Sequence, residues 1–279
     1  MKKTLLSLIA LALISCGGSG ESLSRQSLPS SSEESSLPSA GETTLESSVP
    51  FAWPKVTELP ESEYKTAFFP NYFKRLQAYA SYKAVTEGKT ASTVDQSIAV
   101  TVLKSGEYGY MKNQSDSFFV HTSHEAYYHG QQTYCRDKDA AFALMGLETY
   151  LNTYGTYPFE NSVEGYDVLG EGLVSIEKAE VAQGHGFKIT LDPKKATTNV
   201  RIQMKRFGGL DEYPSFSSIV ITMSVQDDYT PIKVSVDAQY KAKMLFEADC
   251  HQTYDVTYSD FGQNLEIPGL EDAKKVEGF

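Results

Sequence analysis

Basic residues are scarce in this chain relative to acidic ones. Its 279 residues include 25 Lys and Arg against 36 Asp and Glu, which gives a formal net charge of -11 at pH 7. Proteins that hold nucleic acid through phosphate contacts need a basic face, so this charge argues against a nucleic-acid partner. The sequence also has no phosphate-binding loop and no dinucleotide fingerprint. We expect no cofactor and no enzymatic activity.

Long hydrophobic runs are also missing beyond the first residues. The mean hydropathy of -0.34 excludes a protein with many membrane-spanning segments. At the N-terminus, Lys2 and Lys3 precede a short apolar run over residues 5–14 that only Ser7 interrupts. A spanning helix needs about 20 apolar residues, so this run instead indicates a secretory signal peptide.

The end of this run resembles the lipobox of bacterial lipoproteins, because Leu13-Ile14-Ser15 places a small residue directly before Cys16. The resemblance implies a signal peptide of residues 1–15 and transfer of diacylglycerol to the Cys16 thiol. The protein would then be a cell-membrane lipoprotein, held on the extracytoplasmic face by acyl chains in the lipid bilayer. An ordinary cleaved signal with an accidental cysteine is the alternative.

Residues 16–50 are predicted to join this lipidated cysteine to the rest of the protein. Between Gly17 and Pro50, 12 of the 34 residues are Ser and none is aromatic. Such a segment buries too little apolar surface to offset the entropy lost on ordering. We therefore expect a disordered tether, followed by a single folded domain over residues 51–279.

The domain combines two expected helices with many expected strands. Helical spacing of apolar residues covers 71–87, after Pro70, and 139–153, before Gly155. Elsewhere apolar and polar residues alternate with period two, which indicates strands with one buried face. The strands are expected around residues 98–103, 117–121, 127–135, 173–176, 187–191, 200–204, 219–226, 232–243 and 246–258. We predict an α+β fold: a large curled antiparallel β-sheet, an open half-barrel, with two helices covering its concave face.

The last third of the domain resembles a known family. The hairpin Tyr229-Thr230-Pro231-Ile232 leads into long alternating strands, which end in Tyr258-Ser259-Asp260-Phe261-Gly262. With the lipobox and the tether, this pattern is similar to bacterial lipoproteins of the lipoprotein-localisation-factor-like fold, which include periplasmic lipoprotein carriers and glycolipid-binding lipoproteins. The resemblance implies a half-barrel, closed by helices, around an apolar cavity for acyl chains.

On this basis we predict a non-enzymatic lipoprotein that binds a lipid or another apolar ligand between the sheet and the helices. The side chains expected to line the cavity are Phe119, Tyr127, Phe142, Met145, Ile221, Met223, Val234, Val236 and Phe246. The aromatic ones among them could instead belong to the core of the sheet. The second hypothesis is a cell-surface module that binds protein or glycan through exposed aromatic residues, since the chain has 18 Tyr.

Two cysteines and several histidines of the domain also carry potential chemistry. Exported proteins favour disulfides, so Cys135 and Cys250 are predicted to form a bridge, with two buried free thiols as the alternative. His121 and His129 share a face of an expected strand, which makes a zinc site a weaker hypothesis. Surface histidines are the preferred interpretation, and no metal is predicted.

Overall fold

The computed structural model describes residues 53–92, 95–117, 121–158, 163, 165–208, 210–243 and 247–279. The predictions for the signal peptide, for Cys16 and its tether, and for Phe119 and Phe246 lie outside these residues. Within the described ranges, no helix combines the length and the apolar composition that crossing a bilayer requires.

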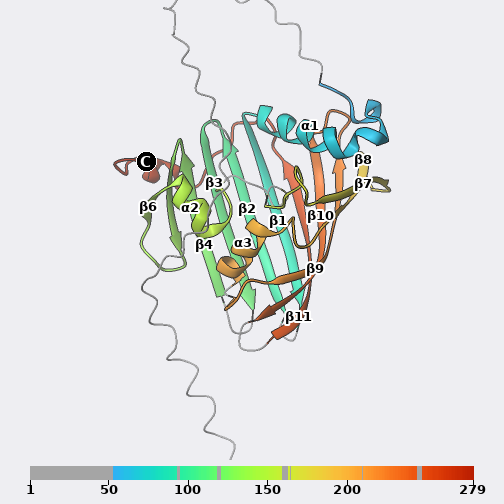
Figure 1. Ribbon diagram of the computed structural model, residues 1–279. Coiled ribbons are helices and arrows are strands. Elements are labelled where there is room, and N and C mark those ends of the chain that lie inside the picture. The colour runs from blue at the N-terminus through green and yellow to red at the C-terminus, as the bar shows by residue number, and fades with distance from the viewer. Residues whose placement is uncertain are drawn as a thin grey trace, which may run out of the picture. The chain divides into compact units, whose positions relative to one another are not determined.

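One antiparallel sheet of 11 strands dominates the described chain (Figure 1). Its spatial order is β6-β5-β4-β3-β2-β1-β11-β10-β9-β8-β7, so β6 and β7 form the edges and the sheet is not closed. The prediction of a large open antiparallel sheet is confirmed. The strands are β1 (Ser81–Ala91), β2 (Gln96–Ser105), β3 (Tyr108–Ser117), β4 (His121–His129), β5 (Gln132–Asp137), β6 (Ala143–Gly146), β7 (Leu173–Ala179), β8 (His185–Leu191), β9 (Ser215–Val225), β10 (Pro231–Lys243) and β11 (Glu247–Ser259).

The first helix differs from the predicted one. Helix α1 spans Tyr64–Ala78 and contains Pro70 in its interior, whereas residues 81–91 form β1. Proline removes a helical hydrogen bond and is expected to begin the helix. Here the aromatic rings of Phe68 and Phe69, which directly precede Pro70 and are 0% and 1% exposed, pack into the core. Their burial stabilises the turn before the proline, so the helix begins earlier.

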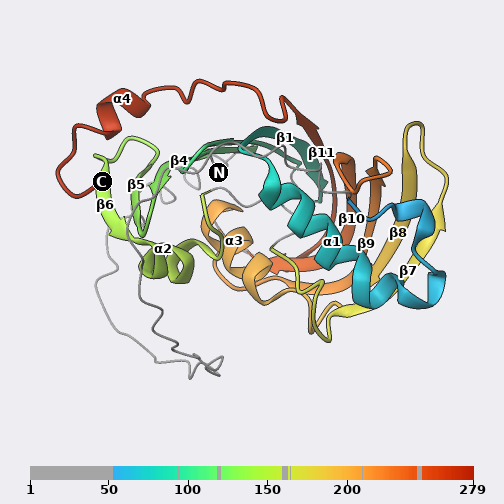
Figure 2. The ribbon, with the colours of Figure 1, turned by 90° about the horizontal axis from the view of Figure 1, so that it is seen from above.

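The remaining helices also depart from the prediction. Helix α2 spans only Leu147–Tyr154, because β6 occupies the residues before it. Helix α3 spans Thr198–Gly208, where alternation predicts a strand. Counting the short α4 (Leu270–Ala273), the described residues contain four α-helices rather than two, together with the 3-10 turns η1 (Val56–Glu58) and η2 (Glu61–Glu63). Helices α1, α2 and α3 lie on the inner side of the curved sheet (Figure 2).

The core is strongly aromatic where α1 meets the inner face of the sheet. The ring of Phe68 lies 4.5 Å from that of Phe187 on β8, and the Tyr72 hydroxyl donates to the Tyr258 hydroxyl at 3.2 Å. Four residues expected in a ligand cavity lie in this packed core and are each at most 2% exposed: Ile221, Met223, Val234 and Val236. They fill the interior on the inner face, and none of the four lines the cavity between the sheet and α3.

The outer face of the sheet is not fully exposed to solvent, because the C-terminal segment covers part of it. Tyr127 on β4 faces outward, packs in a cluster with Ile267 and Ala273, and donates its hydroxyl to the Pro268 carbonyl at 2.9 Å. Phe142 packs against the same cluster. Both residues were expected in the cavity, but the alternation along a strand puts Tyr127 on the face opposite its neighbour Ala126, which is buried in the main core.

Candidate functional site

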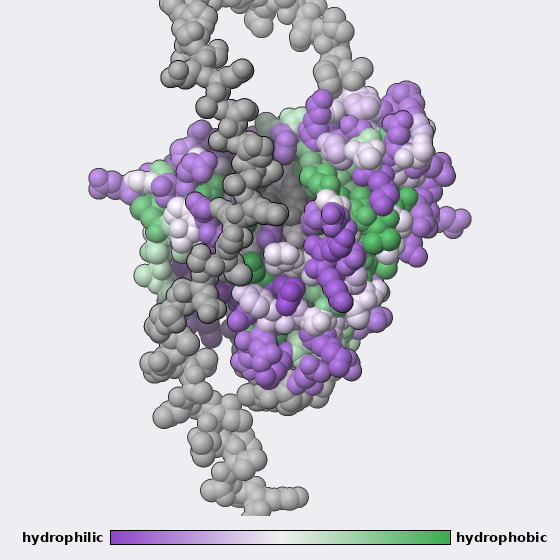
Figure 3. Space-filling view, viewed as in Figure 1, coloured by the Kyte–Doolittle hydropathy of each residue, from purple (hydrophilic) through white to green (hydrophobic). Residues whose placement is uncertain are grey.

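A cavity of about 130 Å³ lies between the inner face of the sheet and α3. An engineered cavity of about 150 Å³ holds benzene, so the space suits a group the size of one ring. Hydrophobic and hydrophilic surface lie side by side on the face of the molecule drawn in Figure 3. The described residues that line the cavity are Ala84, Thr86, Gln96, Ile98, Val100, Val102, Met111, Asn113, Ser115, Thr156, Tyr166, Gln203, Met204, Phe207, Leu210, Tyr240, Gln252 and Tyr254.

The register of the sheet orders this lining from apolar to polar. Ala84 lies near the start of β1, the strand that follows α1, and pairs with the apolar Val102. Two residues further along β1, Thr86 lies in one row with Asn113, which is two strands away on β3. Gln252 lies further still from α1, on β11, and it also lines the cavity. Amide and hydroxyl groups therefore concentrate at the end of the sheet that is remote from α1.

Two of these amides belong to mostly buried residues and have no partner among the described residues. The side chains of Asn113 and Gln252 belong to residues that are only 8% and 6% exposed, and neither amide forms a hydrogen bond with another described residue. By contrast, the Gln96 amide donates to the Ser115 hydroxyl at 2.6 Å, and the Gln203 amide donates to a backbone carbonyl at 3.0 Å. Their amide atoms are open to the cavity, because the one described side-chain polar atom that is fully buried without a partner is the Tyr229 hydroxyl. Asn113 and Gln252 therefore leave hydrogen-bonding capacity unused beside the cavity.

The described lining contains no Asp, Glu, Lys, Arg or His. Two of its tyrosines have a raised pKa and stay protonated at neutral pH. Burial, with the neighbouring Tyr254 hydroxyl 3.3 Å away, raises the pKa of Tyr166 well above its usual value. Burial likewise raises the pKa of Tyr240. The cavity wall is therefore neutral and carries only hydroxyl, amide and apolar groups.

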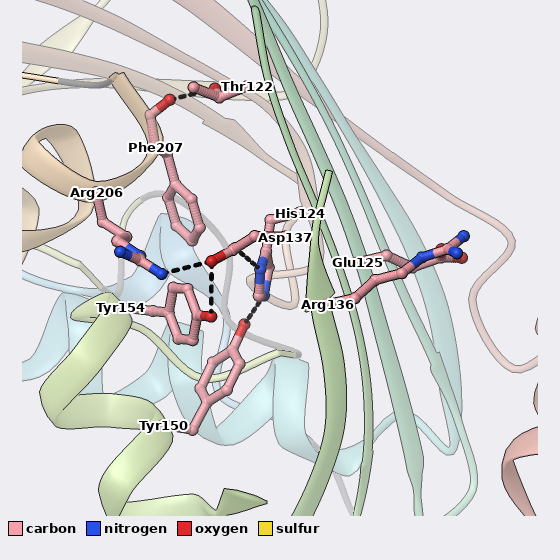
Figure 4. Close-up of polar contacts among 9 residues, drawn as sticks. All are labelled: Thr122, His124, Glu125, Arg136, Asp137, Tyr150, Tyr154, Arg206 and Phe207. Carbon is pink, nitrogen blue, oxygen red and sulfur yellow. Dashed lines mark hydrogen bonds and ion pairs between the residues drawn. The ribbon is translucent and has the colours of Figure 1, made fainter. Parts of the chain in front are cut away.

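A polar network holds α3 against the sheet beside the cavity (Figure 4). On β4, the Nδ1 atom of His124 lies 2.8 Å from Asp137 Oδ1, and its Nε2 atom lies 2.8 Å from the Tyr150 hydroxyl of α2. Arg206 of α3 places a guanidinium nitrogen 2.5 Å from Asp137 Oδ2. These contacts join two strands to two helices, and the next residue of α3, Phe207, lines the cavity.

The charge state of Asp137 depends on this network. Burial opposes ionisation of its carboxyl, but the hydrogen bond to His124 and the positive charge of Arg206 outweigh burial and lower the pKa of Asp137. The arrangement of histidine, carboxylate and tyrosine resembles a set of acid–base groups. However, His124 and Tyr150 are 2% and 0% exposed, and neither lines the cavity. We interpret the network as the attachment of α3 to the sheet.

The predicted disulfide between Cys135 and Cys250 is absent, and both residues are buried free thiols. Cys135 lies on β5 and Cys250 on β11, with four strands between them. That is about 24 Å along the sheet at about 4.8 Å per strand, whereas the Cα atoms of a disulfide lie about 4.4–6.8 Å apart. Burial and the nearby Asp137 carboxylate raise the pKa of Cys135 to about 11, so its thiol is almost entirely protonated at neutral pH.

The histidines of the weaker zinc hypothesis do not meet. His121 and His129 lie at opposite ends of β4, about 26 Å apart at about 3.3 Å per residue. His121 pairs with Asp116, and His129 stacks on Tyr108 and pairs with Glu107. The described residues contain no group of three or more His, Cys, Asp or Glu that could hold a metal ion.

Nine residues were expected from the sequence to line a cavity. None of those that the structure describes lines the cavity under α3. Met145 packs against the core from β6. The sequence analysis sought the most apolar side chains, which fill the interior, and so it missed Asn113 and Gln252. A polar residue on the inward side of an alternating strand was the signal that could have found them.

No protein-family model matches the chain, and no curated protein matches it. Solved structures with some likeness include an S-type phycobiliprotein lyase from Guillardia theta, with 8% identity over 72% of this chain and 97% of that one, at a TM-score of 0.22. An inactive mutant of the CurK dehydratase shares 12% identity over 69% of this chain and 81% of that one, at a TM-score of 0.14. At such scores these likenesses identify no family, and the resemblance to the lipoprotein-localisation-factor-like fold gains no support from them.

Proposed function

We propose that this protein is a non-enzymatic bacterial lipoprotein, anchored through Cys16 to the extracytoplasmic face of a membrane. Its folded domain binds a lipid or another largely apolar small ligand, of which a group about the size of one ring enters the cavity between the sheet and α3. The bilayer is the first partner and the cavity ligand the second.

The observation that carries the ligand-binding part is the unfilled space on the inner face. Near α1 the same face is packed with aromatic rings, whereas under α3 the apolar side chains of Ile98 and Val100 are only partly buried and face the cavity. A ligand that covers them removes apolar surface from water, worth about 25 cal/mol per Å². The binding energy would come from this desolvation without covalent chemistry.

Filling the cavity tests the proposal. Ile98→Trp places a large ring in the space, and the matched control Ala99→Trp adds the same ring to the exposed face of the same strand. Native mass spectrometry of protein purified from bacterial cells is expected to detect a bound small molecule with the unmodified chain and the control, and none with Ile98→Trp. A bound molecule that survives Ile98→Trp, or its absence from all three proteins, would contradict ligand binding in this cavity.

The anchor is tested separately. Cells that express the unmodified chain with labelled palmitate are expected to place the label on the protein and the protein in the membrane fraction. Cys16→Ala is expected to abolish both. Labelling that persists in Cys16→Ala would refute the assignment of the lipidated cysteine and leave the cavity unaffected.

The alternative of an exposed aromatic surface finds no specific support in the described residues. The large hydrophobic side chains exposed there lie on separate elements and include a single aromatic one: Leu144, Leu169, Val174 and Tyr213. Scattered exposed apolar residues are ordinary on protein surfaces. We therefore do not propose a protein-binding or glycan-binding module.

A further inference from the structure

The two unpartnered amides lie on different walls of the cavity. Asn113 projects from β3, and Gln252 projects from β11, three strands away in the sheet. Both residues are more than nine-tenths buried, and no other described residue offers either amide a hydrogen bond. Two separate amides with free hydrogen-bonding capacity therefore face the same cavity.

Unpaired amides are an unusual feature of a folded interior. Most polar groups of a protein interior bond to another protein group or to ordered water. Leucine would fit the alternation of either strand, yet both strands place an amide at the cavity. A ligand with hydroxyl or amide groups would supply the missing partners, because such groups both donate and accept hydrogen bonds.

The charge of the ligand is limited by the same wall. The described lining residues include no acidic side chain, no basic side chain and no histidine. A carboxylate, phosphate or ammonium group would enter without a counter-charge, and burial of an unpaired charge is strongly unfavourable. The geometry therefore favours polar groups without charge.

We infer that the cavity takes an uncharged amphipathic ligand, in which a hydroxyl or amide group is joined to an apolar part. The polar group hydrogen-bonds to either Asn113 or Gln252, which lie three strands apart, and Ile98, Val100 and Phe207 cover the apolar part. This inference rests on the proposed function, since it names the chemical class of the ligand that the cavity binds.

Three single-ring probes test the inference: benzamide, benzoate and toluene. Each is titrated by NMR into the full chain that carries Cys16→Ala and therefore no acyl groups. Benzamide is expected to bind about ten-fold or more tightly than benzoate, because benzoate would bring an unpaired charge. It is also expected to bind about five-fold more tightly than toluene, which can make no hydrogen bond.

Matched variants assign the selectivity to the two amides. The double variant Asn113→Leu/Gln252→Leu is expected to lose the preference for benzamide over toluene and to bind toluene at least as well as before. Gln114→Leu is the control, because it makes a similar change on the exposed face of β3. Thermal unfolding of each variant confirms that the fold persists.

The outcomes separate this inference from the proposed function. If toluene and benzamide bind equally, and the double variant changes neither, the cavity binds ligands without using its amides and the inference is wrong. Tighter binding of benzoate would also overturn it. If no probe binds, the cavity is not a binding site, and both the inference and the ligand-binding function fail.

Discussion

The two ends of the inner face differ although they belong to the same strands. Near α1, aromatic rings such as Phe68 and Phe187 fill the space, and the buried Tyr72 hydroxyl has a partner. Near α3, a cavity remains, and the amides of Asn113 and Gln252 that face it have no partner among the described residues. The α1 end is packed as a stable core is expected to be, apart from the buried Tyr229 hydroxyl, which has no partner among the described residues. The α3 end leaves both space and polar groups open. Departures of this kind are expected at functional sites.

The largest expected effect concerns packing at the two ends. Phe68→Ala removes a fully buried ring that contacts Phe69, Phe187 and Tyr229, and it is expected to cost about 3–5 kcal/mol. Phe207→Ala removes a half-buried ring beside the cavity and is expected to cost about 1–2 kcal/mol. Urea unfolding of both variants measures the difference. Equal costs would show that the α3 end is as tightly packed as the α1 end.

A smaller effect concerns the attachment of α3. The lowered pKa of Asp137 means that its ionised form stabilises the fold above the unfolded-state pKa. This contribution is lost as the pH falls through the lowered value, below about pH 4. Arg206→Met is expected to cost about 1 kcal/mol at pH 7, at the low end for a charged pair because Asp137 is half-buried, and to weaken the loss of stability on acidification.

The control for this variant is Lys205→Met, which removes the same charge from the neighbouring position of α3. Lys205 lies over the exposed Tyr213 ring and makes no contact with Asp137 in the described network. Unfolding curves between pH 2 and pH 7 are expected to change shape for Arg206→Met only. Identical pH profiles for the two variants would show that the ion pair does not hold α3.

The smallest expected effect is on stability, where one substitution at each end of the inner face is expected to change the free energy of unfolding in opposite directions. Tyr72→Phe removes a paired hydroxyl near α1 and is expected to destabilise the protein by about 1 kcal/mol. Asn113→Leu removes an unpaired amide near α3 and is expected to stabilise it by about 1 kcal/mol. Differential scanning calorimetry of both variants tests this. Destabilisation by Asn113→Leu would mean that the amide already has a partner in the protein.

The strands were predictable because their pattern is local. Alternation along residues 232–243 fixes both the strand and its inward face, since successive side chains point to opposite sides. The helices were less predictable because distant contacts decide them. The alternating residues 200–204 fit a strand, yet Val200, Gln203, Met204 and Phe207 also lie on one face of a helix, and the structure adopts the helix.

The sequence also could not predict which distant strands approach each other closely. Gly88 reads as the end of a helix, but in β1 it lies opposite Tyr254 of β11, where an added Cβ would come within 2.3 Å of the tyrosine Cβ. The cysteines illustrate the same limit. Their number suggested a bridge, and only the strand order shows that Cys135 and Cys250 are too far apart.

The amino-acid sequence alone determined the acidic charge, the alternating strands and the pattern around Cys16, because composition and short-range periodicity depend only on neighbouring residues. The tertiary structure decided which inward side chains meet a packed helix and which face an empty space. Asn113 and Gln252 belong to one site only because the strand order and the curl of the sheet bring β3 and β11 around the same cavity. No local pattern encodes that meeting, since it depends on the pairing of β1 with a strand more than a hundred residues away.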